Sequence, residues 1–206
     1  MLRILFTQLA GGRRAPRLPR VLAIAALLLG PGLTAAGASE GGTPVTVTRV
    51  DGAYVVQARF SVPQSTAEVI AVLTDYDGIP RFLPGIRRSV VRSRQGARTM
   101  VEQEAVSRVL LFSRRVHLLL EIDESADALV FRDTSGRSFE RYEGAWRVSP
   151  AGHATLVRYE LTARPAFSVP ESVLIRLFRR DSRETIARLA AEIARRAAPP
   201  GFSTRE

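Results

Sequence analysis

Short runs of alternating apolar and polar residues recur along the chain and lead into one long amphipathic helix, and this order is the strongest constraint on the fold. Residues 155–163 show the alternation most clearly, with Val157, Tyr159 and Leu161 on one face. A period of two is typical of a strand with one covered and one solvated face. Comparable runs cover residues 45–62, 86–93, 99–107, 110–122, 128–133 and 138–148. Turn-forming residues separate most of these runs, so the pattern predicts an antiparallel sheet.

Two short helical segments are predicted near the start of this sheet. Asp51-Gly52 is a hairpin turn signal that divides residues 45–62 into two strands. Ser65 and Glu68 then have the spacing of a capping box, which predicts a helix that begins there. Residues 79–84 form a second, shorter helical turn bounded by two prolines.

A helix of about 27 residues, roughly 40 Å long, is predicted at the C-terminal end. Pro170 is a favoured first-turn residue, and Pro199-Pro200-Gly201 ends the helical pattern. One stripe of this helix consists of Ile175, Phe178, Ser182, Ile186, Leu189 and Ile193. We therefore predict an α+β fold in which a curved antiparallel sheet wraps around the long C-terminal helix, with two short helices after the first strand. Such an arrangement buries every apolar face and encloses a hollow between sheet and helix.

The first 38 residues have the order of a secretory signal peptide. A basic segment precedes the apolar run of residues 21–29, and Ala36-Gly37-Ala38 is a small-x-small cleavage site. The alternative is an uncleaved N-terminal membrane anchor, because residues 21–39 carry no charge. Gly30-Pro31-Gly32 would interrupt a spanning helix, so we expect cleavage, export and a periplasmic location.

The remaining chain is expected to be one domain with short flanks. Residues 39–44 are predicted to be a flexible lead-in, residues 45–197 the folded domain, and residues 198–206 a flexible tail. Hydrophobic residues make up 46% of the chain and charged residues 24%, a balance typical of globular proteins.

Several classes of function are disfavoured by composition. The chain has no cysteine, which excludes disulfides, thiolate metal sites and a cysteine nucleophile. His117 and His153 are isolated from acids at ligand spacing, so no metal site is expected. No phosphate-binding loop or dinucleotide fingerprint occurs, and we expect no cofactor. The basic residues are all arginine and spread along the chain, which does not indicate a nucleic-acid partner.

The segment from 45 to 197 resembles the START-like (helix-grip, SRPBCC) superfamily, and within it the coenzyme-Q-binding and polyketide cyclase/dehydrase family. The residues that carry the resemblance are Ser61-Val62-Pro63, the segment 73–84 (LTDYDGIPRFLP), Gly144-x-Trp146, and the helix that Pro170 begins. The resemblance implies a helix-grip fold and a tunnel for a lipid-like molecule. It leaves the ligand and any catalysis open, because one fold serves many functions.

Ten residues are candidates for ligand contact. By resemblance Tyr76, Ile79, Phe82 and Leu83 lie near the tunnel mouth, although they could simply close the core. The inward candidates on the strands are Phe112, Phe131, Trp146 and Tyr159, of which Trp146 and Tyr159 pair an apolar body with a polar handle. Phe178 and Ser182 lie on the apolar stripe of the long helix. Ser182 could face the hollow, or could be small so that the helix approaches the sheet closely.

Three functions remain open from the sequence. The first is a non-catalytic carrier of a hydrophobic molecule such as a lipid, isoprenoid or quinone-like compound, held by buried apolar area and oriented by Tyr76 or Tyr159. The second is a cyclase/dehydrase-type enzyme that uses Glu102 or Glu104 for proton transfer. Acidic residues at alternating positions more often lie on the solvent-exposed face of a strand. The third is a module that touches an anionic membrane surface or a protein partner through the arginines of residues 176–196.

Overall fold

Eight antiparallel strands form one sheet in the computed structural model, which describes residues 43–109 and 112–198, without the side chains of residues 107–114. The strands are β1 (Val45–Val50), β2 (Ala53–Val62), β3 (Ile86–Gln95), β4 (Arg98–Val109), β5 (Phe112–Glu124), β6 (Ala128–Asp133), β7 (Phe139–Ala151) and β8 (Ala154–Pro165). Their order across the sheet is β1-β2-β8-β7-β6-β5-β4-β3. The predicted α+β helix-grip architecture is therefore confirmed. The predicted signal peptide, most of the lead-in, and residues 199–206 of the predicted tail lie outside the described residues.

The strands follow one another as hairpins except where β2 pairs with β8. Asp51 and Gly52 connect β1 to β2 with φ values of 48° and 79°. Two positive φ values are what a two-residue hairpin turn requires to match the strand twist, so the predicted turn is confirmed. The pairing of β2 with β8 places residues from the two ends of the domain side by side in the sheet.

Two short helices and a single 3-10 turn follow β2. They are α1 (Thr66–Leu73), η1 (Tyr76–Gly78) and α2 (Ile79–Phe82). The predicted capping box is present, because the Glu68 amide donates to Ser65 Oγ and the Ser65 amide donates to Glu68 Oε2 at 2.8 Å. Asp75 caps η1 by accepting a hydrogen bond from the Gly78 amide.

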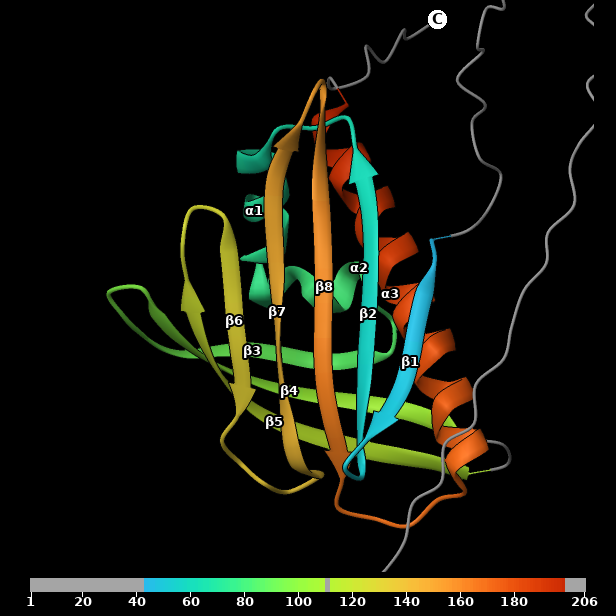
Figure 1. Ribbon diagram of the computed structural model, residues 1–206. Helices are drawn as coiled ribbons and strands as arrows, with labels where there is room; N and C mark the ends of the chain where they lie inside the picture. The colour runs from blue at the N-terminus through green and yellow to red at the C-terminus, as the bar shows by residue number, and fades with distance from the viewer. Residues whose placement is uncertain (1–42, 110–111, 199–206) are drawn as a thin grey trace, which may run out of the picture. The chain divides into compact units, whose positions relative to one another are not determined.

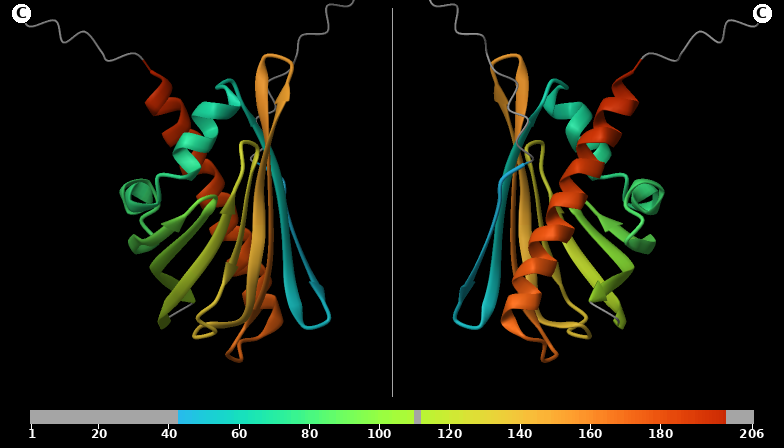
Figure 2. Two further views of the ribbon diagram at one scale, coloured as in Figure 1. Left: turned by 90° about the vertical axis from the view of Figure 1, so that its left-hand side faces the viewer. Right: turned by 90° about the vertical axis from the view of Figure 1, so that its right-hand side faces the viewer.

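The long helix α3 (Glu171–Ala197) crosses the open side of the sheet diagonally (Figures 1 and 2). Its buried residues include Ser182, Ile186, Leu189 and Ile193, which belong to the predicted stripe. The helix packs on β1, β2, α1 and α2. Among the described residues, no helix has the length and apolarity required to cross a membrane.

The sheet is strongly bent. Figure 1 shows β3, β4 and β5 running across the direction of β2, β7 and β8, and Figure 2 shows the two halves diverging on either side of α3. Register shifts in β3 and at the start of β7 are local irregularities of the kind that bend and twist strands. Among the strands, α3 packs chiefly on β1 and β2, at one side of the bent sheet.

A candidate ligand cavity between sheet and helix

The inner face of the sheet, α3 and the short helices enclose a cavity of about 690 Å³. Its walls are mainly apolar, and the contributors span every strand from β3 to β8. They include Leu73, Ile86, Val116, Leu118, Leu120, Ile122, Leu129, Leu161, Leu174 and Leu189. Both the volume and the apolar lining are typical of sites that take up small hydrophobic molecules.

All predicted site residues with described side chains line this one cavity. They are Tyr76, Ile79, Phe82, Leu83, Phe131, Trp146, Tyr159, Phe178 and Ser182. The side chain of Phe112 lies outside the described residues, so its predicted role stays a prediction. Ser182 is only 6% exposed and borders the cavity, so its small side chain adds to the hollow from the middle of α3.

Aromatic side chains form the part of the sheet wall that β6, β7 and β8 contribute, together with aliphatic residues. The rings of Trp146 and Tyr159, on paired positions of β7 and β8, are stacked with centroids 4.2 Å apart. Tyr142 lies between Phe131 and Phe139, with centroid distances of 6.0 and 4.8 Å. Offset and tilted ring contacts of this kind rigidify a wall, because rings carry much contact area on few rotatable bonds.

Gly144 allows this wall to form. It lies between Tyr142 and Trp146 on the same face of β7, paired with Phe131 of β6 and Leu161 of β8. A Cβ atom at this position would fall on the carbonyl oxygen of Glu160 and within 2.8 Å of the Phe131 ring. Glycine is therefore needed here for the close approach of β8 and of the Phe131 ring.

The hydroxyls of Tyr142 and Tyr159 have no hydrogen-bond partner in the part of the chain that the structure describes. Burial raises the pKa of Tyr142 to about 12, with a further contribution from the charge of Asp133. Burial also raises the pKa of Tyr159 well above its usual value, and Tyr142 adds to the effect. Both phenols therefore remain neutral and act as hydrogen-bond donors near neutral pH.

Tyr76 differs from these two tyrosines. Its hydroxyl donates to Glu124 Oε1 at 3.0 Å, and the Arg94 guanidinium lies 5.6 Å from its ring centroid. Burial and then the Glu124 carboxylate raise the pKa of Tyr76. Tyr76 is 3% exposed, so its ring both belongs to the core and borders the cavity, while its hydroxyl is already engaged. Of the two predicted polar handles, only Tyr159 has a hydroxyl that no described residue engages.

The short-helix lip, defined as residues 76–84, meets the C-terminal part of α3 at the rim of the cavity. Arg196 joins the two, because its Nη2 lies 2.6 Å from Asp75 Oδ2 and its guanidinium 6.0 Å from the Phe82 ring centroid. The same guanidinium donates to Glu192 at 2.8 Å. Partial burial acts to raise the pKa of Asp75, but the hydrogen bond and charge of Arg196 and the charge of Arg81 outweigh it and lower that pKa.

Glu102 and Glu104 lie on the outer face of β4, away from the cavity, whereas Val101 and Gln103 point inward. Glu102 forms an ion pair with Arg92 and lies 3.6 Å from His117 Nε2. The hydrogen bond from Arg92 is the main reason why the pKa of Glu102 is lowered rather than raised. These carboxylates therefore cannot act on a molecule inside the cavity. Among the described residues, no group of three or more histidines or acids could hold a metal ion.

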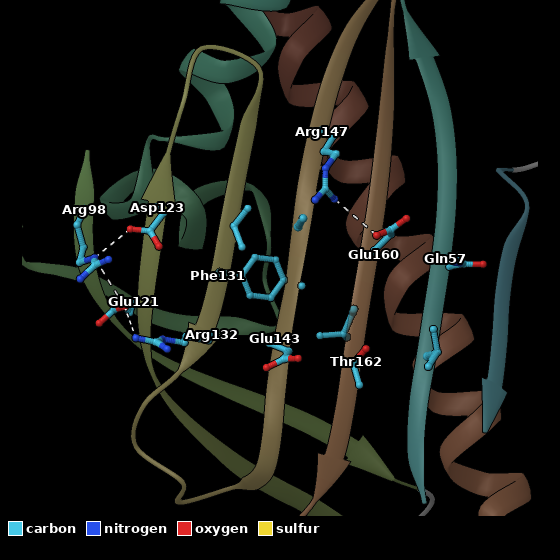
Figure 3. A pocket seen from close by; sticks show the side chains of 15 residues that line it. Gln57, Arg98, Glu121, Asp123, Phe131, Arg132, Glu143, Arg147, Glu160 and Thr162 are labelled. Atoms are coloured by element: carbon cyan, nitrogen blue, oxygen red, sulfur yellow. Dashed lines mark hydrogen bonds and ion pairs between the residues drawn. The ribbon is translucent and has the colours of Figure 1, made fainter. Parts of the chain in front are cut away.

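The outer face of the sheet carries its own shallow hollow, shown in Figure 3, of about 480 Å³. Arg98 lies 2.9 Å from Asp123 and 3.7 Å from Glu121, which also pairs with Arg132 at 2.6 Å. Opposite charges on neighbouring strands satisfy one another here, so this surface is a solvated ladder of ion pairs. The apolar inner cavity is the better candidate for a binding site.

The cavity-lining residues that sequence reasoning missed include Tyr142, Phe139 and Gln103. Tyr142 could have been found, because it precedes Gly144 and Trp146 by two and four positions and must share their face. Gln103 donates from Nε2 to Ser89 Oγ at 3.2 Å and is a buried polar residue of β4. Phe139 is at the start of β7, where the register shift hides the alternation.

The fold and cavity define a helix-grip protein with a binding space between sheet and C-terminal helix. The chain belongs to the family described as polyketide cyclase / dehydrase and lipid transport, whose sequence model matches residues 34–194. The predicted membership of the START-like superfamily and of its polyketide cyclase/dehydrase family is therefore confirmed, whereas the resemblance to coenzyme-Q-binding proteins stays a prediction. No curated protein matches the chain significantly.

Solved structures confirm the same fold. A protein from Thermus thermophilus is 22% identical with a TM-score of 0.61, and the match covers 70% of this chain and 99% of that one. The Zhui aromatase/cyclase from Streptomyces sp. R1128 is 14% identical with a TM-score of 0.63 over 72% and 98% of the two chains. A STAR-related lipid transfer protein from Xanthomonas axonopodis is 14% identical with a TM-score of 0.55 over 74% and 99%. At these identities the likeness concerns the START-like fold, which both lipid-binding and cyclase-type proteins use.

Proposed function

We propose that the protein is a non-catalytic carrier of a hydrophobic, lipid- or isoprenoid-like molecule, which it holds in the cavity between the sheet and α3. The observation that carries this proposal is the cavity itself, about 690 Å³ with mainly apolar walls. Each 100 Å² of apolar ligand surface buried there contributes on the order of 2.5 kcal/mol before the costs of association. A quinone is one ligand of this class.

The cavity favours holding a molecule over transforming it. The carboxylates that border it, Asp181 and Glu184, lie on α3 at its rim. Glu184 is exposed and lies 3.8 Å from Arg188. Tyr142 and Tyr159 stay protonated and can donate hydrogen bonds but cannot accept a proton near neutral pH. A cyclase/dehydrase-type reaction that removes a proton would need a base placed against the substrate.

Export and membrane contact complete the proposal. The apolar run of residues 21–29 and the small residues 36–38 support a periplasmic location. Arg176 and Arg183 are exposed on α3, and they support transient contact with an anionic membrane during ligand exchange. N-terminal sequencing of protein from the periplasmic fraction tests export: a mature start at residue 39 is expected, and an intact leader in the membrane fraction would contradict it.

Native mass spectrometry before and after organic extraction tests the carrier function. We expect an additional mass on the order of a few hundred daltons that extraction removes and that returns unchanged on reloading. Ser182→Leu should reduce the bound fraction, because the larger side chain enters the cavity. Arg183→Leu, at the exposed neighbouring position, is the matched control. If the protein carries no enriched species and the extracted protein takes up no hydrophobic probe, the carrier function is wrong; a returned ligand of altered mass would instead indicate an enzyme.

A further inference from the structure

His117, on the outer face of β5, has two competing partners for one ring nitrogen. Arg137 Nη1 lies 3.2 Å from His117 Nε2, and Glu102 Oε1 lies 3.6 Å from the same atom. A guanidinium can only donate hydrogen bonds, and an ionised carboxylate can only accept them. Nε2 must therefore be unprotonated to bind Arg137, and it must carry a proton to bind Glu102. The nitrogen cannot satisfy both partners in one protonation state.

These side chains border a second hollow on the outer face of the sheet, on the opposite side from the ligand cavity. The hollow has a volume of about 510 Å³, and Met100 and Leu119 line it together with the charged groups. It shares no lining residue with the hollow of Figure 3. The side chains of His117 and Glu102 are 23% and 18% exposed, so water screens their interaction only in part.

Arg137 belongs to the loop of residues 134–138, which connects β6 to β7. Both ends of this loop are held by backbone groups of β5: the Thr134 amide donates to the Leu119 carbonyl oxygen at 2.8 Å, and the His117 amide donates to Ser138 Oγ at 3.0 Å. The loop tip, defined as residues 136 and 137, turns at a φ of 61°. Among the described residues, its only hydrogen bond to the sheet is the one from Arg137 to the His117 ring.

The charges near the ring decide what a proton on Nε2 would do. They come from four strands and the loop, and they are Glu102 and Glu104 of β4, Arg88 and Arg92 of β3, Arg115 of β5, Asp133 of β6, and Arg137. A proton on Nε2 would face the Arg137 guanidinium, which repels it, and the Glu102 carboxylate, which attracts it. Protonation of the ring therefore replaces the first partner by the second.

We propose that His117 is an acid-sensitive switch for the loop tip. The neutral imidazole holds the tip through Arg137, and the charged imidazole releases it and binds Glu102. Histidine is the side chain whose charge ordinarily changes between pH 5 and 8. Release leaves a charged imidazole beside a guanidinium that has lost its ring partner, so the outer face becomes more cationic in acid. This inference concerns the outer face and does not depend on the proposed carrier function.

Nuclear magnetic resonance of the full-length protein tests the switch. At about pH 8 the His117 Nε2 signal should be that of an unprotonated nitrogen, and the amides of Gly136 and Arg137 should have order parameters near about 0.85. At about pH 5.5 both ring nitrogens should be protonated, and the two order parameters should fall below about 0.6. Leu118 and Leu120, buried neighbours on β5, should stay rigid and so report an intact fold.

His117→Gln is the matched variant, because glutamine can offer an acceptor oxygen to Arg137 but does not titrate. Its loop tip should stay ordered at both pH values. In Glu102→Gln the tip should lose order at a lower pH than in the unchanged protein, because the charged imidazole has lost its carboxylate partner. A purely structural role of His117 would not produce that shift.

The neutral fluorescent probe N-phenylnaphthylamine reports separately on the cavity, and its affinity should be the same at both pH values. A protonated Nε2 at about pH 8, or an equal loss of order in His117→Gln at about pH 5.5, would overturn the switch. Failure of the probe to bind would contradict the carrier function and leave the switch standing.

Discussion

Arg196 Nη2 lies 2.6 Å from Asp75 Oδ2 and so links the last turn of α3 to the residue that immediately precedes the short-helix lip. Both side chains are less than one-third exposed, and the same guanidinium lies over the Phe82 ring. Partly shielded pairs of this kind are worth more than fully exposed ones. The contact therefore holds closed the side of the cavity where the lip meets the helix.

Loss of this contact should speed ligand exchange. In Arg196→Ala we expect N-phenylnaphthylamine to dissociate about threefold to tenfold faster, because the lip separates from α3 more often, with a stability loss of about 1–2 kcal/mol. Stopped-flow displacement measures the rate. Arg195→Ala is the control, since Arg195 also pairs with Glu192 but is largely exposed and makes no contact with Asp75. Equal dissociation rates in both variants and the unchanged protein would show that the lip is not held by Arg196.

Glu192 should make the protein sensitive to acid. The hydrogen bond from Arg195, together with that from Arg196, lowers the pKa of Glu192 to about 2 against the desolvation that raises it. Because the folded-state pKa is below the unfolded one, the stabilisation is complete above about pH 5 and is lost as the pH falls toward 2. Chemical denaturation at several pH values should show a steeper loss of stability below pH 4 in the unchanged protein than in Glu192→Gln. Parallel curves for the two proteins would contradict this assignment.

Gly144→Ala should destabilise the fold by at least about 2 kcal/mol, because the new Cβ meets the backbone of β8 and the Phe131 ring. Gly85→Ala is a matched control, since a Cβ there has no atom within 4 Å. We expect its effect to be within about 0.5 kcal/mol. Thermal and urea denaturation of both variants measure the difference, and similar losses would show that Gly144 is not required for close packing.

Glu102→Gln/Glu104→Gln should leave the affinity for N-phenylnaphthylamine unchanged, since both side chains are on the outer face of β4. A small decrease in stability is expected from loss of the ion pair between Arg92 and Glu102. Fluorescence titration of the probe checks the first outcome. A change in probe affinity of more than twofold would mean that substitutions on the outer face of β4 alter the cavity.

Local sequence rules determined most of the elements of this protein. The capping box of Ser65 and Glu68, the Asp51-Gly52 turn and the stripe of α3 depend only on neighbours within a few residues. Alternation along a strand also settles which residues share a face, so that Phe131, Trp146 and Tyr159 could be named as inward candidates. These patterns are local because a hydrogen-bonded turn or a strand face repeats every two to four residues.

The tertiary structure alone decided which polar groups are free inside the cavity. The Tyr76 hydroxyl donates a hydrogen bond to Glu124, which lies 48 residues away in sequence. The hydroxyls of Tyr142 on β7 and Tyr159 on β8 have no such partner among the described residues. Likewise Arg196 meets Asp75 across 121 residues. Such pairings follow from the curvature of the sheet and from the β2–β8 pairing, which no local periodicity encodes. The sequence could therefore predict an apolar hollow and most of the residues that line it. The tyrosine hydroxyls that are free inside the cavity, and the contact between Arg196 and Asp75 at its rim, could be identified only from the folded chain.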